Sequence, residues 1–416
     1  MLLLTLIATM VTAAACGESL DGGAACPSLC PSQTQNFRDT TFEAVMLDTS
    51  VSGFPSLGLS AMMLLANRPD TLVTRGVLRF DVLATSFLPN GVGPLDSITT
   101  VDSVYLTLPL DTTGRRGSAP VTIEVFDVDT TASDTVTAVV SSLFRPDRRI
   151  GSMTVVPSLT SDTLRIPLSR TVLERKIADK APLRVGLRMT GGTGQLRIVA
   201  FTYDAGAPTL RYDASSDTVY SQIVVGTNTS LANAIADVNL AYQVYSIIDH
   251  TSPAVGADAL VVGGFPAYRS YLRFRIPSYI TDSSTIVRAE LLLTQRPSTF
   301  ADAGDSVAIA ALVPTTTESV TDMRRVLDLS ADGVFASIDT TRLVPRDSGL
   351  KAINVLTLAR NWRLLPGNVP RALAFRINRE GAQAAELRFF SSKTSTPSLR
   401  PRLRITYLPR SEFALP

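Results

Sequence analysis

The feature that most constrains the fold is an internal duplication. Residues 74–83, TRGVLRFDVL, align without gaps with residues 268–277, YRSYLRFRIP, and four of the ten positions are identical. Further matched blocks follow in the same order at a nearly constant offset: 273 − 79 is 194, and 401 − 208 is 193. This pattern predicts two tandem domains of roughly 170 residues. Because two copies are too few for a stacked repeat array, each copy is expected to bury its own core.

The matched blocks alternate between apolar and polar residues with a period of two. Leu78 and Phe80 share one face of their block, opposite Arg75 and Arg79, and the second copy repeats the alternation. Such strands are half-buried in antiparallel sheets. With 25 Gly and 25 Pro to supply turns, they predict an all-β fold of two tandem antiparallel β-sandwich (jelly-roll) domains. Apolar residues spaced three and four apart add one short helix to each domain. The four residues expected to pack these helices are Val172, Ile177, Leu358 and Trp362.

Composition and motif spacing divide the chain into five segments. The predicted boundaries are a signal peptide at 1–16, a flexible tether at 17–39, a first β-sandwich at 40–214, a junction at 215–241 and a second β-sandwich at 242–410. The junction has no counterpart in the first copy, and its SQIVVGT stretch is typical of a strand.

The N-terminus is typical of an export signal. Residues 1–15 are apolar, end in three alanines and are too short for a spanning helix, which needs about 20 residues. Cys16 follows directly and resembles the lipid-accepting cysteine of a bacterial lipobox. No Lys or Arg precedes the apolar run, and Ala13 stands where that pattern usually has Leu. We therefore expect a membrane-anchored lipoprotein, periplasmic or at the cell surface; an ordinary secretory signal and a buried segment remain alternatives.

Cys26 and Cys30 are the two other cysteines of the chain. In an oxidising compartment they are candidates for a disulfide, although so short a loop stabilises little. Two free thiols are the alternative. A metal site would need more ligands, and the single histidine, His250, is far away in the sequence.

Several motifs of the second copy resemble the DNRLRE-type module, a jelly-roll family of bacterial surface proteins that is similar to carbohydrate-binding modules. They are, in order, IIDHTSPAVGADALVVGG, RSYLRFRIP, VRAELLLT, LARNWRLLPGN and RPRLRITY. The resemblance covers 242–409; the first copy, 40–213, matches more weakly because it lacks the Trp and the R-P-R-L run. The resemblance implies a non-catalytic module that binds glycans or serves as a structural segment.

Catalytic and nucleic-acid signals are weak in this sequence. The formal net charge of +2 and the 18% charged residues leave no electrostatic footprint for nucleic acid. With one histidine, a His-centred metal site cannot form, and a Ser-His-Asp triad would have to use His250. We expect no enzyme and no cofactor. Three aspartates in DVDTTASD, namely Asp127, Asp129 and Asp134, are weak candidates for a structural calcium ion, with turn formation as the alternative.

The polar face of the duplicated strand carries the candidate ligand-binding residues. They are Arg75, Arg79, Arg269, Tyr271 and Arg273. Arginine forks match the carboxylates and sulfates of acidic glycans, which makes a polysaccharide or another surface polymer the expected partner. Ion pairs with neighbouring strands are the alternative use of these arginines. The membrane is expected as a partner through the N-terminal lipid alone. Purely structural or adhesive modules, acting as spacers or assembly units, are the alternative function.

Overall fold

The computed structural model describes most of the two repeats. The described residues are 37–43, 45–54, 62–89, 93–158, 161–200, 207–215, 222–227, 244–250, 256–298, 306–313, 335–365, 367, 371–378 and 380–409. The predicted signal peptide and Cys16, Cys26 and Cys30 lie outside these residues. Within them, no helix combines the length and apolarity that a membrane span requires.

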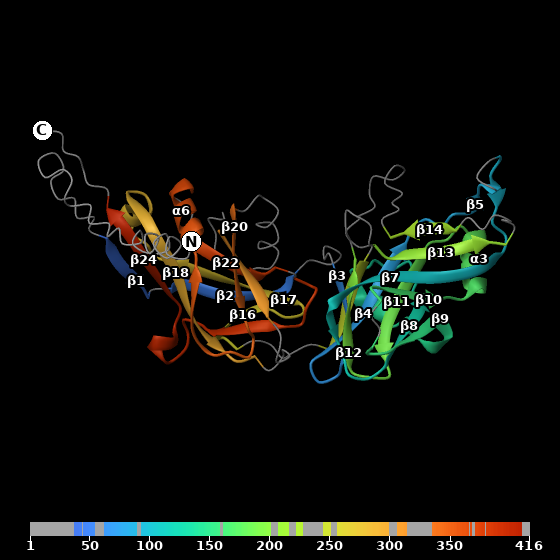
Figure 1. Ribbon diagram of the computed structural model, residues 1–416, viewed down its shortest axis with the longest axis horizontal. Coiled ribbons are helices and arrows are strands. Elements are labelled where there is room, and N and C mark those ends of the chain that lie inside the picture. The colour runs from blue at the N-terminus through green and yellow to red at the C-terminus, as the bar shows by residue number, and fades with distance from the viewer. Residues whose placement is uncertain are drawn as a thin grey trace, which may run out of the picture.

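The described strands form two lobes, each built on an eleven-stranded sheet (Figure 1). The first lobe contains β3 (Met62–Arg68), β4 (Leu72–Phe80), β7 (Val101–Arg116), β8 (Val121–Asp127), β9 (Arg149–Val155), β10 (Thr163–Pro167), β11 (Leu183–Thr190), β12 (Gly194–Val199), β13 (Thr209–Ala214), β14 (Ile223–Gly226) and β15 (Val244–His250). A two-stranded ribbon, β5 (Ser86–Phe87) with β6 (Asp96–Ser97), lies at its edge.

The second lobe combines strands from both ends of the chain. Its members are β1 (Arg38–Phe42), β2 (Val45–Phe54), β16 (Ala259–Gly263), β17 (Ala267–Phe274), β18 (Ser284–Arg296), β19 (Val307–Val313), β20 (Phe335–Leu343), β21 (Gly349–Asn354), β22 (Ala372–Ile377), β23 (Glu386–Phe390) and β24 (Arg402–Pro409). All pairings in both lobes are antiparallel. The mostly-β, antiparallel part of the prediction is therefore confirmed.

The two lobes have the same strand order. The path β14-β13-β7-β12-β3-β4-β11-β8-β9 in the first lobe corresponds to β1-β24-β18-β23-β16-β17-β22-β19-β20 in the second. In each lobe, the contact between the two middle strands is short: two residue pairs join β3 to β4, and one joins β16 to β17. The path folds there into two layers, and the apolar residues of both layers enclose a common core.

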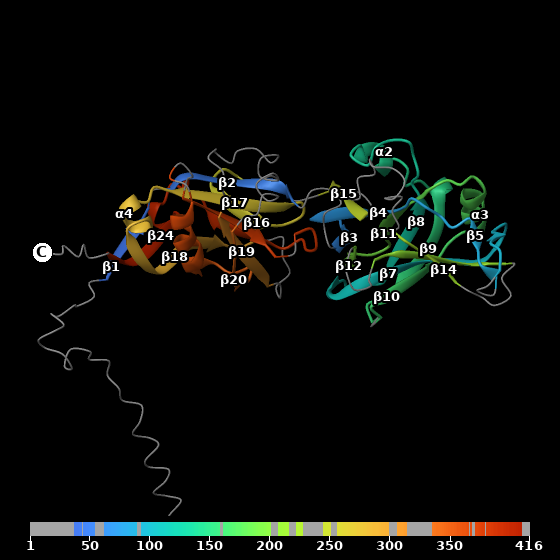
Figure 2. The same cartoon turned by 90° about the horizontal axis from the view of Figure 1, so that it is seen from above.

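Strands β2 and β15 each pair with a strand of the repeat to which they do not belong by sequence. Strand β2 pairs with β17 along its length, and β15 pairs with β4. Ser50 lies opposite Ser270, and Ser246 lies opposite Gly76; since 270 − 76 is 194, Ser50 and Ser246 occupy equivalent positions. Figure 2 shows β2 among the strands of the second lobe and β15 beside β4. We call β1–β2 and β14–β15 the donor strands.

This exchange departs from the predicted domain boundaries. The segment 40–214 was expected to form one sandwich, but β2 within it belongs to the second lobe. Likewise, the segment 242–410 contains β15, which belongs to the first lobe. The stretch SQIVVGT of the predicted junction contributes strand β14 as expected, and β14 extends the first lobe by pairing with β13. Each lobe is thus completed by the donor strands of the other repeat.

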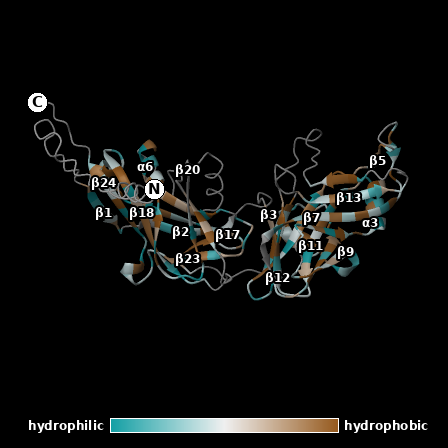
Figure 3. Ribbon diagram, viewed as in Figure 1, coloured by the Kyte–Doolittle hydropathy of each residue, from teal (hydrophilic) through white to brown (hydrophobic). Residues whose placement is uncertain are grey.

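Both lobes enclose the apolar faces that the alternation predicted. Leu78 and Leu272 are fully buried, as are most of the aliphatic residues that face them from the second layer. The brown segments of Figure 3 follow these strands. A smaller apolar cluster of Leu64, Ala66 and Leu72 in the first lobe also contacts Phe265 of the second lobe.

The second face of β4 is covered rather than open. The connection from β8 to β9 contains α2 (Thr137–Ser141) and η3 (Pro146–Arg148), and it folds back over this face. Phe144 packs there on Phe126, with ring centroids 5.4 Å apart. A Cβ at Gly186 would approach Phe144 to 2.6 Å, so glycine leaves the room that this cover needs.

The predicted helices form at the expected places. In the first lobe α3 spans Arg170–Ala178 and buries Leu173 and Ile177, while Val172 packs at the edge of the core. In the second, α6 (Leu356–Asn361) runs into η5 (Trp362–Leu364), and α4 (Ser278–Thr281) and η6 (Pro397–Leu399) add single turns. Trp362 is fully buried and donates its indole N–H to the carbonyl of Ala372 at 3.2 Å. It is therefore a core residue, and it does not form a stacking surface.

Candidate binding site

The arginines of strand β4 form internal ion pairs. Arg75 Nε donates to Asp249 at 2.5 Å, and its terminal nitrogen donates to the carbonyl of Ser141 at 2.7 Å. Arg79 contacts Asp81 at 2.8 Å and Asp134 at 2.7 Å. Burial disfavours the charge of Arg79, but these two carboxylates outweigh it and raise its pKa.

Asp134 is the centre of this polar cluster. It is 4% exposed and comes from the connection that covers the sheet face. The hydroxyl of Tyr245, on the donor strand β15, donates to Asp134 at 2.6 Å, and Arg184 lies 3.5 Å from the same oxygen. Burial, with the hydrogen bond to this carboxylate, raises the pKa of Tyr245 far above its ordinary value. The cluster thus ties the donor strand and the cover to β4 and β11.

On strand β17, the equivalent of Arg75 is Arg269, and it is more deeply buried. Arg269 donates two hydrogen bonds to Glu380, at 2.8 and 2.7 Å, and both side chains are 7% exposed. Tyr271 is 6% exposed, and burial raises its pKa to about 12 despite the nearby guanidinium of Arg269. Neither residue offers a surface to a glycan. Arg269 follows the alternative of an ion pair within the protein, and Tyr271 is a buried residue of the sheet.

Arg273 differs from the other four predicted ligand-binding residues. Its side chain is half-buried, and it lies opposite Ala372 in the neighbouring strand β22. Among the described residues, no ion pair or hydrogen bond of its guanidinium is present. The five residues therefore do not converge on one site, because Arg75 and Arg79 lie in the first lobe, and Arg269, Tyr271 and Arg273 in the second.

The raised pKa of Tyr271 predicts a loss of stability in alkaline solution. The phenol is neutral in the fold, so its contribution is fully present below its unfolded pKa of about 10 and is lost as the pH rises toward 12. We expect the stability of the second lobe to fall more steeply between pH 10 and 12 in the wild type than in Tyr271→Phe. Denaturant titrations followed by Trp362 fluorescence measure this, because Trp362 is the single tryptophan of the chain and lies in that lobe. Parallel pH curves would contradict the assignment.

The three aspartates considered for calcium face cations of the protein. Asp129 and Asp127 lie 2.6 and 3.6 Å from Lys176 Nζ, and Asp134 belongs to the arginine cluster described above. Within the described part of the chain, no three His, Cys, Asp or Glu side chains are placed to hold a metal ion. The calcium expectation is therefore replaced by ion pairs. His250 ends strand β15, opposite Val73.

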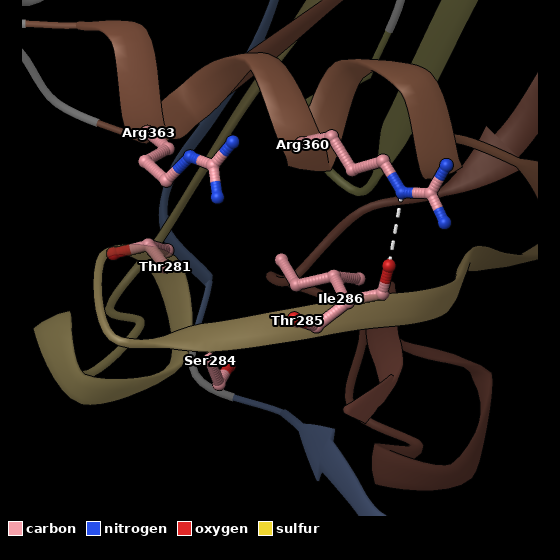
Figure 4. A pocket seen from close by; sticks show the side chains of 6 residues that line it. All are labelled: Thr281, Ser284, Thr285, Ile286, Arg360 and Arg363. Carbon is pink, nitrogen blue, oxygen red and sulfur yellow. Dashed lines mark hydrogen bonds between the residues drawn. The ribbon is translucent and has the colours of Figure 1, made fainter. Parts of the chain in front are cut away.

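A shallow recess in the second lobe was not predicted from the sequence. It has a volume of about 120 Å³ and lies between η5, the end of α6 and the start of β18. Figure 4 shows Arg360 and Arg363 above the strand segment that carries Thr285 and Ile286, with Thr281 on the other side of the opening. Arg360 Nε donates to the carbonyl of Ile286 at 2.9 Å. Both arginines are exposed, and in the described residues neither has an ion-pair partner.

The recess has a partial counterpart in the first lobe. There Glu174 of α3 accepts from the main-chain N–H of Val101, at the start of β7. In both lobes a charged helix residue thus holds the beginning of the long central strand, but the charge is negative in one and positive in the other. Arg360 and Arg363 lie three residues apart within the LARNWRLLPGN motif, but only the fold brings them close to Thr285.

No family model and no curated protein matches the chain. Among solved structures, a protein of Parabacteroides distasonis described as secreted is 9% identical, with 88% of this chain and 99% of that chain covered and a TM-score of 0.24. A T=1 particle of infectious bursal virus is 12% identical, covering 90% and 73%, with a TM-score of 0.14. The C-terminal domain of the Streptococcus pyogenes protein AspA is 9% identical, covering 84% and 91%, also at 0.14. At these TM-scores the likenesses carry no argument about fold or function.

Proposed function

We propose that this protein is an exported, non-catalytic surface lipoprotein, anchored through Cys16, whose two lobes act as a structural unit. The observation that carries the proposal is the use of the repeated arginines. Four of the five residues expected to bind a ligand are held inside the sheets: Arg75, Arg79 and Arg269 by carboxylates, and Tyr271 by burial. Their role is to join strands, donor segments and covering connections, which is what a spacer or assembly unit requires.

The polar contacts support this reading because of where they lie. The ion pair Arg75–Asp249 and the hydrogen bond from Tyr245 to Asp134 connect strand β15 to elements of the other repeat. Arg269 and Glu380 are buried together, where a charge without its partner would be costly. Polar groups placed in this way join neighbouring elements of the fold. Of the two arginines of β17, Arg269 is buried and Arg273 is half-buried.

Binding of an acidic polysaccharide is the second candidate function, and the recess at Arg360 and Arg363 favours it. Two guanidinium groups lie on one side of an opening that also carries threonine residues (Figure 4). Arginine forks bind carboxylate and sulfate groups in two-point contacts. The expected ligand chemistry is the same as that predicted for the strand arginines, but its location is different.

A glycan array with the detergent-solubilised full chain separates the two functions. The structural proposal expects no glycan to be retained above background. Retention of sulfated or uronic-acid glycans that is lost in Arg363→Ala but kept in Arg273→Ala would instead establish the recess as the binding site. Arg273→Ala is a suitable control because it removes an arginine from the same lobe, outside the recess.

The anchor is tested separately by metabolic labelling with radioactive palmitate in a bacterial host. We expect label on the wild-type chain and a membrane-fraction signal that moves to the soluble fraction in Cys16→Ser. Cys26→Ser is the control and should keep the label. A labelled Cys16→Ser chain, or an unlabelled wild type that is nevertheless exported, would exclude lipid anchoring at this residue.

A further inference from the structure

We propose that donor strands β1 and β2, residues 38–54, are exchangeable between copies of this chain, so that two copies can close each other's second lobe in a reciprocally swapped dimer. The partner is a second copy, because the acceptor is the second lobe itself. The surface it uses is the edge of β17 and the edge of β24, which β2 and β1 occupy in the single chain.

The chain topology is the first argument for exchange. In the first lobe, donor strand β14 follows its partner β13 after eight residues, 215–222, so donor and acceptor are close in sequence. In the second lobe, the donor is contributed from far away: Asp48 contacts Ser392 across 344 residues, and Asp39 contacts Thr406 across 367. The whole first lobe lies between donor and acceptor in the chain. During folding, β17 and β24 therefore present open edges until β1 and β2 arrive, and the same strands of another copy can arrive first.

The second argument is that the donor recognises this acceptor specifically. Asp48 accepts hydrogen bonds from the main-chain N–H of Ser392, at 2.5 Å, and from its hydroxyl, at 2.7 Å, and it is 8% exposed. Ser50 contacts the hydroxyl of Ser270 at 2.8 Å and accepts from the N–H of Val261 at 2.8 Å.

The first lobe has an apolar residue where the second has Asp48. Val244 lies opposite Leu78 as Asp48 lies opposite Leu272, and 272 − 78 is 194. Asp48 placed there would be a buried carboxylate without Ser392, which is costly. Strands β1 and β2 thus fit the second lobe of any copy and do not fit the first lobe.

The energetics allow both forms. A swapped dimer makes the same donor–acceptor contacts as the single chain. The balance between the two forms therefore depends on the protein concentration, compared with the effective concentration of the donor strands at the acceptor of their own chain. High local concentration shifts the balance toward the dimer.

A disulfide trap tests the exchange directly. The background is the full chain with Cys16, Cys26 and Cys30 replaced by serine. One variant of it carries Ser50→Cys and another carries Ser270→Cys. The two variants are mixed, unfolded together, refolded at increasing protein concentration and oxidised. Each chain then carries one new cysteine. In a swapped dimer, the cysteine at position 50 of one chain lies opposite the cysteine at position 270 of the other. We expect a covalent heterodimer that increases with concentration and exceeds, roughly tenfold, the yield from the control mixture of Ser50→Cys with Ser278→Cys. Ser278 lies exposed in the same lobe, out of register with β2.

A single chain that carries both Ser50→Cys and Ser270→Cys verifies the pairing in the monomer. Refolded in dilute solution, it should form the disulfide within one chain. If the heterodimer yield does not exceed that of the control at any concentration, the proposal is overturned. Strands β1 and β2 would then pair only with the second lobe of their own chain. A double variant that stays reduced in the monomer would also overturn it, because β2 would then not occupy β17.

Discussion

Proline at Ser50 is expected to destabilise the second lobe, and proline at Ser246 the first, although each residue belongs by sequence to the other repeat. Ser50 lies in the middle of β2 and Ser246 in the middle of β15. Proline has no main-chain N–H, fixes φ and removes the serine hydroxyl, so it is disfavoured inside a strand that pairs along its length. We expect each variant to lose roughly 1–3 kcal/mol, more if the whole donor strand detaches.

The single tryptophan makes the assignment measurable. Trp362 is buried in the second lobe, so its fluorescence reports the unfolding of that lobe. Ser50→Pro should lower the denaturant midpoint of the fluorescence transition far more than Ser246→Pro does. Hydrogen exchange should show the reverse order for strands β4 and β11. If Ser50→Pro instead exposes amides of the first lobe and leaves the fluorescence transition unchanged, the strand exchange is refuted.

Removal of the carboxylate of Glu380 is the second change with a large expected effect. Glu380→Ala leaves Arg269 buried with its charge and without its two-point partner. Breaking a buried pair in this way costs about 3–5 kcal/mol. The second lobe, followed by Trp362 fluorescence, should unfold at a much lower denaturant concentration.

Two controls show that this effect comes from the uncompensated charge. Asp347→Ala removes a carboxylate that pairs with Lys351 in the same lobe but is 52% exposed, and it should cost at most about 1 kcal/mol. The double variant Arg269→Met with Glu380→Leu removes both charges and should recover most of the lost stability. If Glu380→Ala behaves like Asp347→Ala, Arg269 is accessible to solvent and returns as a candidate for ligand binding.

The cover over β4 and the recess at Arg363 could not be predicted from local sequence patterns. The polar face of β4 was expected to be open, since Arg75 and Arg79 alternate with small or apolar residues as in an exposed sheet face. The cover formed by α2 and Phe144 lies more than 50 residues away in sequence, and Asp134, which neutralises Arg79, comes with it. The recess at Arg363 was missed for a related reason, since the turn of η5 and the start of β18 meet only in space.

The sequence by itself determined the duplicated strands, their apolar faces and the helix of each repeat. These features depend on contacts between residues two, three or four positions apart, and they repeat at a constant offset, so a period and an alignment are enough to find them. Leu78, Leu272 and Trp362 are buried as their patterns indicated. Only the tertiary structure decided which lobe each donor strand completes and which carboxylate each arginine meets. The edges of β4 and β17 offer similar backbone hydrogen bonds, so side chains decide which of them pairs with β2 and which with β15. Asp48 and Ser392 are such side chains, and because they are 344 residues apart, no local sequence pattern reveals their contact.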